Sequence, residues 1–169
     1  GMVAQAYGAD DMTEAHKLLS QSIYVALAIA ILILICQRPI AGLATSLLDI
    51  GTEHQPLVMD YYNIRIWAAP ATLMIYGLYG WLFGMQDAVT PMIITIVINV
   101  INIILSYLLV VELDYGIKGA AMGTLCAEYT GVIVMLIVIS RRYGVVAAGL
   151  REIRGWAAYF RLNRDLFVR

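Results

Sequence analysis

Charged side chains are scarce in this chain of 169 residues: Asp, Glu, Lys and Arg make up 14% of it, whereas soluble domains contain about 25%. Eleven basic and twelve acidic residues give a net charge of −1. Chains that bind nucleic acid usually carry blocks rich in lysine or arginine, and no such block is present. We therefore expect no nucleic-acid partner.

Residues that hold metals or carry out catalysis are also few. The two cysteines, Cys36 and Cys126, lie in separate apolar runs, where a free cysteine usually acts as a small buried hydrophobe. The two histidines, His16 and His54, have no companion at a spacing that suits a metal site. The HExxH, G-x-S-x-G, GxGxxG and P-loop motifs do not occur. The sequence predicts no enzyme, no metal and no cofactor.

Hydrophobic residues, by contrast, make up 62% of the chain, and the mean hydropathy is +0.80. A soluble domain has about 45–50%. These residues form long runs, and a helix needs about 20 apolar residues to cross a bilayer. The sequence predicts an all-α, multi-pass bundle of four transmembrane helices, at about 12–37, 61–84, 91–111 and 117–140.

Several residues mark where these helices begin, end or bend. Thr13 is expected to cap the first span and Pro39 to follow its end. Residues 39–60 are expected to form a connector at the membrane surface, containing a short amphipathic piece. Pro70 lies inside the second span and should kink it, because proline removes a backbone donor and clashes with the preceding turn.

Glycines at a spacing of four predict close contacts between helices. Gly80 and Gly84 form one such pair in the second span, and Gly119 and Gly123 form another in the fourth. The turn at 112–116 is short, so the third and fourth spans should be antiparallel neighbours.

The C-terminal part carries most of the positive charge: seven of the eleven Lys and Arg residues lie at or after Arg141. By the positive-inside rule this end is cytoplasmic, and four spans place the N-terminal end there too. Residues 143–162 read as a cytoplasmic amphipathic linker, lying in the membrane interface or packed on protein. Asn163 is suited to cap a further helix at 163–169. Four spans without a closing element indicate part of a longer protein.

Polar residues interrupt the apolar spans. Asn99, Asn102 and Ser106 share one face of the third span. Two interpretations remain open: hydrogen bonds between helices, worth about 0.6–2 kcal/mol each, or the wall of a cavity for a cation or a polar substrate. In the fourth span, Thr124 lies one turn before Glu128, on the same face.

Glu128 is the most distinctive single residue of the four spans. An isolated carboxylate in a medium of low dielectric constant favours its protonated form, which would let Glu128 take up and release a proton. The alternatives are a neutral, hydrogen-bonded structural group or a partner of an arginine in a further helix. Arg65 itself is expected to form a surface ion pair with Asp60, and Asp87 to form a turn.

Three stretches resemble the multidrug and toxic compound extrusion (MATE) transporters, in particular their DinF-like branch. They are GMVAQAYGADD, YYNIRIWAAPATLMIYGLYGWLFGMQDAVTPM and INVINIILSYLLVVELDYGIKGAAMGTLCAEYTG. The closing FRLNRDLFVR is similar to the entry of the family's seventh helix.

The resemblance implies a position and an activity for the chain. It would run from the end of helix 2 to the start of helix 7 of a twelve-helix protein with two lobes, so residues 1–142 would be most of the N-terminal lobe. The activity implied is export of drugs or toxic cationic and amphipathic compounds by alternating access. Inward flow of protons or sodium ions would drive it. The expected partners are membrane lipid, a small organic substrate, and helices 1 and 2 and the C-terminal lobe of the same protein.

The resemblance also assigns some residues. Asn102 and Thr124 match members of the family's cation-binding polar cluster, and Tyr61 or Tyr62 matches its tyrosine. Ser106 departs from the pattern, because many members have an aspartate there. A missing carboxylate weakens a sodium site and favours proton coupling, with Glu128 or an acid of the first helix as carrier.

Two rival functions remain at this point. A related lipid-linked-saccharide flippase would share the fold, but it needs buried cations in its cleft for phosphate groups, and the spans show none. A structural membrane subunit without transport activity would use the polar face for helix contacts alone.

Overall fold

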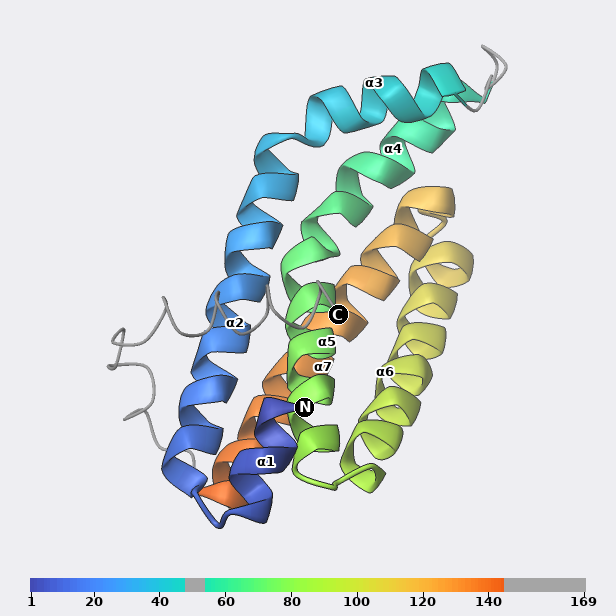
Figure 1. Ribbon diagram of the computed structural model, residues 1–169. Helices are drawn as coiled ribbons and strands as arrows, with labels where there is room; N and C mark the ends of the chain where they lie inside the picture. The colour runs from blue at the N-terminus through green and yellow to red at the C-terminus, as the bar shows by residue number, and fades with distance from the viewer. Residues whose placement is uncertain (48–53, 145–169) are drawn as a thin grey trace.

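A computed structural model describes residues 1–47 and 54–144, which are helical almost throughout and contain no strand (Figure 1). Four helical segments of this part are long and apolar enough to cross a membrane. The predicted all-α bundle with four membrane helices is therefore confirmed. The linker predicted at 143–162 lies, apart from its first two residues, outside the described residues, as does the helix predicted at 163–169.

The N-terminal part forms α1 (Met2–Gly8) and α2 (Met12–Ile35). Asp11 caps α2, because its carboxylate accepts a hydrogen bond of 2.9 Å from the Glu14 N–H. The prediction of Thr13 as the cap is wrong: Thr13 already lies inside the first turn, where its hydroxyl cannot replace the carboxylate. α3 (Gln37–Leu47) follows α2 at once and bends away from its axis.

The second span is broken into two helical segments. It comprises α4 (Gln55–Arg65), the 3₁₀ turn η1 (Ile66–Ala68) and α5 (Ala69–Gly84). The span begins at Gln55, six residues before the predicted start. Pro70 lies in the first turn of α5, where its missing N–H costs nothing, and the irregular turn falls just before it.

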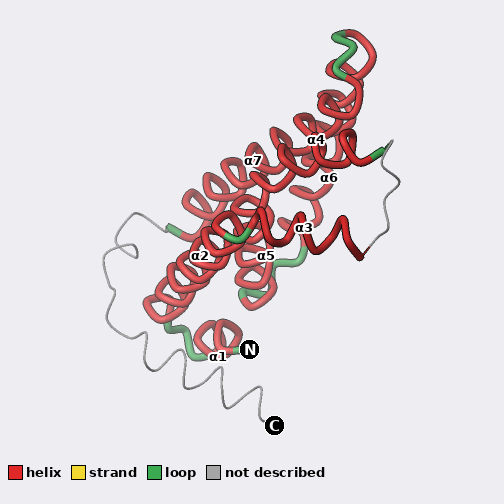
Figure 2. Tube along the Cα trace, turned by 90° about the horizontal axis from the view of Figure 1, so that it is seen from above, coloured by secondary structure: helices red, strands yellow, loops and turns green. Residues whose placement is uncertain are grey.

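The last two spans pack against each other as antiparallel neighbours (Figure 1). They are α6 (Val89–Tyr107), which ends in the π-helical turn η2 (Leu108–Glu112), and α7 (Gly116–Tyr143). α7 also contacts α4 and α5, whereas α2 packs mainly on α5 (Figure 2). α7 therefore connects the pair formed by α2 and α5 to α6.

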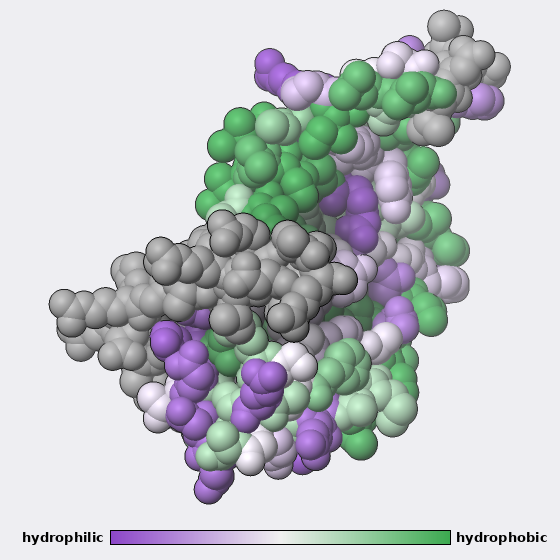
Figure 3. Space-filling view, viewed as in Figure 1, coloured by the Kyte–Doolittle hydropathy of each residue, from purple (hydrophilic) through white to green (hydrophobic). Residues whose placement is uncertain are grey.

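The core lies at the α1 end of the bundle, where Trp81, Leu78 and Met135 are fully buried. The Trp81 indole N–H donates to the Ala15 carbonyl of α2 across 2.7 Å. Elsewhere much apolar surface is open. In the third span, Val89–Glu112, only 6% of the most apolar stretch is buried, and hydrophobic residues cover the upper part of α2 (Figure 3). Such surface suits contact with lipid or with other membrane helices.

Glycines on α7 allow α6 and η2 to approach closely. A Cβ on Gly119 would lie 2.9 Å from the Leu109 backbone, and one on Gly123 would lie 2.6 Å from Ser106 Oγ. In the second span, Gly84 lies against Val3 of α1, and a Cβ added to Gly84 would lie 2.5 Å from the Val3 Cβ.

Gly80 makes no such approach, because nothing lies within 4 Å of its Cβ position. Within residues 1–47 and 54–144, the predicted close contact at Gly80 is therefore not found. Gly80 lines an open groove whose other walls come from α1 and α2.

Candidate functional site

The polar residues of α6 and α7 meet along the seam between these helices. Asn102 donates from Nδ2 to Thr124 Oγ1 across 2.8 Å, and the Thr124 hydroxyl donates to the Ala120 carbonyl. Ser106 lies one turn after Asn102, against Gly123. The close approach that glycine allows thus brings Asn102, Ser106 and Thr124 together, half-buried.

Asn99 does not join this cluster. It is exposed on α6, in the middle of an apolar span, and no hydrogen bond to another described residue holds it. An amide facing hydrocarbon is costly, so this face is suited to contact with other protein or with water.

Glu128 is held by two side chains of the broken span. Its Oε1 lies 2.6 Å from Arg65 Nη2, and its Oε2 accepts a hydrogen bond from the Thr72 hydroxyl. The Glu128 side chain is 13% exposed and the Arg65 side chain 30% exposed. The picture of Glu128 as an isolated carboxylate is wrong, and its arginine partner lies within the described spans.

The predicted ion pair between Arg65 and Asp60 is also wrong. Asp60 pairs instead with Lys118, at 3.2 Å. Residues five apart on a helix differ by about 140° in direction, whereas helical ion pairs form at three or four apart. Arg65 therefore points toward α7 rather than toward Asp60.

The Glu128 contacts lie on both sides of the break in the span. Arg65 is the last residue of α4, before η1, and Thr72 lies in α5, after it. The next residue of α7, Tyr129, donates from its hydroxyl to the Trp67 carbonyl inside η1, across 2.9 Å. Two adjacent residues of α7 thus hold the segment before the break, the break itself and the segment after it.

A second polar cluster lies at the other end of the bundle, around Asp87 in the loop between α5 and α6. The Asp87 side chain is only 6% exposed. It accepts bonds from the Thr90 N–H and hydroxyl at 3.0 and 2.6 Å and from the Tyr143 hydroxyl at 2.9 Å. Arg142 Nη1 lies 3.0 Å from its Oδ2.

These partners decide the protonation of Asp87. Burial opposes its ionisation, but the hydrogen bonds from Thr90 and Tyr143 and the charge of Arg142 outweigh it, and the pKa of Asp87 lies below its ordinary value. Asp87 is therefore more than the predicted turn residue, since it joins the α5–α6 loop to the end of α7.

Sequence reasoning missed Arg65, Thr72 and Tyr129 as partners of one site. A signal existed for Arg65, which is a charged residue followed by a long apolar run, and such residues usually have a partner.

Tyr62, one candidate for the family tyrosine, donates to the Gln37 carbonyl of α3 across 2.8 Å, whereas Tyr61 is exposed. Across 1–47 and 54–144, no three His, Cys, Asp or Glu side chains could hold a metal ion.

The chain has clear relatives among known proteins. The sequence profile of the MatE family matches residues 1–108. The chain is 34% identical, over its whole length, to DNA damage-inducible protein F of Escherichia coli (strain K12), of which it covers 38%. It is 25% identical to the human multidrug and toxin extrusion protein 1, with 95% of the chain and 29% of that protein aligned.

One solved structure has a similar fold. It is an inward-facing conformation of a multidrug resistance MATE family transporter, with a TM-score of 0.79 over 90% of this chain and 36% of that one, at 22% identity. The chain thus spans less than two fifths of the length of these relatives.

Proposed function

The chain belongs to the MatE family, and on this premise we propose that it forms part of a secondary transporter that exports drugs or toxic cationic and amphipathic compounds. Export would be coupled to inward movement of protons, or of sodium ions, through alternating access. Two of the relatives are named for multidrug extrusion or multidrug resistance, and this chain covers 29% and 36% of them. Their activity comes to this chain as a proposal.

One observation carries the coupling part of the proposal: the Glu128 carboxylate holds residues on both sides of the break in span two. A proton on Glu128 would remove most of its attraction for Arg65, which keeps its own charge. The angle between α4 and α5 at Ile66–Ala68 would then be free to change. In this way proton binding would be linked to a change in the shape of the lobe.

Sodium is the weaker alternative to the proton as the coupling ion. Asn102 and Thr124 offer neutral oxygen atoms, and Ser106 offers a hydroxyl where a carboxylate would bind a hard cation more strongly. We propose these three residues as the wall of a substrate or cation site, and Asn99 as a residue that faces the same path.

The argument against the flippase alternative was that the spans contain no buried cation, and Arg65 corrects that premise. Its charge is matched by Glu128, however, so it is not a free binding site for a phosphate group. We place the protein in the cell (inner) membrane with both ends of the chain in the cytoplasm, from the distribution of Lys and Arg.

The test is drug efflux by the complete protein in proteoliposomes, with a proton or a sodium gradient imposed in turn. We expect efflux with the proton gradient, and its loss in Glu128→Gln. Glu112→Gln is the matched control, because Glu112 is exposed at the end of η2. Undiminished proton-driven efflux in Glu128→Gln would remove Glu128 from the mechanism and leave the transporter assignment standing. If only a sodium gradient drives efflux, sodium and not the proton is the coupling ion.

A further inference from the structure

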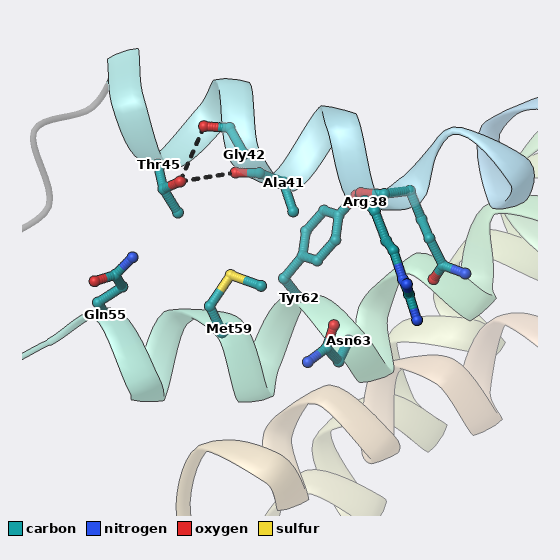
Figure 4. Close-up of a pocket in the computed structure, with 9 residues that line it drawn as sticks. Arg38, Ala41, Gly42, Thr45, Gln55, Met59, Tyr62 and Asn63 are labelled. Atoms are coloured by element: carbon teal, nitrogen blue, oxygen red, sulfur yellow. Dashed lines mark hydrogen bonds between the residues drawn. The ribbon is translucent and has the colours of Figure 1, made fainter.

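A polar cavity of about 530 Å³ lies between α3 and α4, and its described lining includes none of Arg65, Thr72 and Glu128. Figure 4 shows Gln55, Met59, Tyr62 and Asn63 of α4 facing residues of α3, with the Arg38 side chain extending from α3 toward α4. Arg38 is the single charged residue among the described residues that line it. The cavity therefore has a positive charge and no described carboxylate to balance it.

Some of the donors around this cavity are engaged within the described residues and others are not. The Tyr62 and Thr45 hydroxyls donate to backbone carbonyls of α3. In contrast, the Arg38 guanidinium and the amides of Gln55 and Asn63 have no hydrogen-bond partner within 1–47 and 54–144. A guanidinium with amide donors beside it is the donor set that phosphate groups bind, often in bidentate fashion.

The depth of the cavity in the membrane follows from helix length. Gln55–Gly84 has 30 residues, or about 45 Å of helix, whereas the hydrocarbon core of a bilayer is about 30 Å thick. The charged and amide residues of this span, Gln55, Asp60, Asn63 and Arg65, all lie in α4, and α5 has none. We therefore assign the excess length to the first turns of α4, at the level of the lipid head groups. α3 begins where the apolar span of α2 ends, so it lies at the same level.

The surroundings of the cavity suit lipid rather than open water. On α3, Leu43 is 63% exposed and Leu47 81% exposed, and Figure 3 shows hydrophobic residues along this helix. An amphipathic helix of this kind lies in the membrane interface with its apolar side chains among the acyl chains. Apolar side chains thus flank a cationic cavity at the depth where lipid phosphates lie.

We propose that this cavity binds the phosphodiester group of a membrane phospholipid, with Arg38 as the principal ligand and Asn63 and Gln55 as further donors. Bound lipid would hold α3 against α4 and so fix the outer end of the broken span. The proposal does not depend on which compound is exported or on the coupling ion.

The experiment measures lipid binding to the complete protein in detergent, by native mass spectrometry and by quenching of tryptophan fluorescence. The probes are dioctanoyl phosphatidylglycerol, dioctanoylglycerol, which has the same chains without the phosphate, and inorganic phosphate. We expect phosphatidylglycerol to bind and dioctanoylglycerol to bind far more weakly. Arg38→Gln should weaken phosphatidylglycerol binding about tenfold or more, as for a lost charge-assisted hydrogen bond.

Two further variants keep the result interpretable. Arg141→Gln removes one exposed cation at the other end of the bundle and should bind like the wild type. Arg38→Lys keeps the charge and should bind with intermediate affinity, even where Arg38→Gln lowers the yield of folded protein. Equal binding by Arg38→Gln and the wild type, or equal binding of the two lipid probes, would overturn the proposal. If inorganic phosphate binds and phosphatidylglycerol does not, the cavity binds free phosphate, and the proposal of a phospholipid ligand is overturned.

Discussion

Removing the carboxylate of Glu128 should destabilise the bundle more than removing any exposed acid. At 2.6 Å and an effective dielectric constant of about 20, the attraction between Glu128 and Arg65 is about 6 kcal/mol before desolvation. Desolvation of the two ions offsets most of this, so the net contribution of the pair is small. Its loss is costly for another reason, since a single substitution leaves the partner charge half-buried and unpaired.

The magnitude follows from the burial of the two side chains. Breaking a fully buried pair costs about 3–5 kcal/mol. Arg65 is 30% exposed and water can reach it, so we expect about 2–3 kcal/mol for Glu128→Gln. The double variant Arg65→Gln/Glu128→Gln leaves no unpaired charge and should be more stable than the sum of the single changes by about 1–2 kcal/mol.

The assay is reversible unfolding of the complete protein in detergent or bicelles, with wild type, both single variants and the double variant measured together. Asp60→Asn is the matched control, because Asp60 and Lys118 form an ion pair whose side chains are 44% and 53% exposed. An exposed pair is worth about 0–1 kcal/mol. Additive effects of the two Arg65 and Glu128 substitutions, or a cost for Glu128→Gln no larger than for Asp60→Asn, would refute the reasoning.

Three other changes test packing and charge by thermal unfolding of the same preparation. Gly123→Ala should cost about 1–3 kcal/mol, since its Cβ would meet Ser106 Oγ at 2.6 Å, while Gly80→Ala, with open space, should be neutral or slightly stabilising. Asp87→Asn should destabilise at neutral pH by about 1–3 kcal/mol. Because the pKa of Asp87 is lowered by folding, this difference should persist above about pH 4 and vanish as the pH falls further. Trp81→Phe leaves an α2 carbonyl without its indole donor and should cost about 1–3 kcal/mol; an unchanged midpoint would show that another donor replaces it.

The fold could be predicted because it depends on local patterns. Four apolar runs and one short turn identify the four membrane helices and the contact between α6 and α7. The spacing of Gly119 and Gly123 indicates a close seam, which the structure shows, whereas Gly80 has no described neighbour within 4 Å of its Cβ position. Spacing describes a helix face but does not say what lies opposite.

The Glu128 site could be predicted only in part. Its partners Arg65 and Thr72 lie 63 and 56 residues away along the chain, and no local pattern connects them. Nearness in sequence suggests Asp60 as the partner of Arg65, yet Asp60 faces another side of α4 and pairs with Lys118. The Asp87 cluster shows the same limit: Thr90 is readable as a capping neighbour, whereas Tyr143 belongs to another helix.

The two ends of the bundle are held together in different ways, and this difference determines where the unit can bend. At the Asp87 end, a buried carboxylate gathers four contacts from α6 and α7, and the Trp81 indole lies edge-on to Tyr143 at 5.2 Å. At the other end, residues 66–68 form a 3₁₀ turn instead of regular α-helix. They are braced by two residues of α7, because Glu128 pairs with Arg65 and Tyr129 donates to the Trp67 carbonyl. A force on the bundle, or the loss of one charge, should therefore move α4 before it moves α5. If lipid also holds α3 against α4, the outer end of the span has two independent restraints, one polar and internal and one at the membrane surface, and each can be removed without the other.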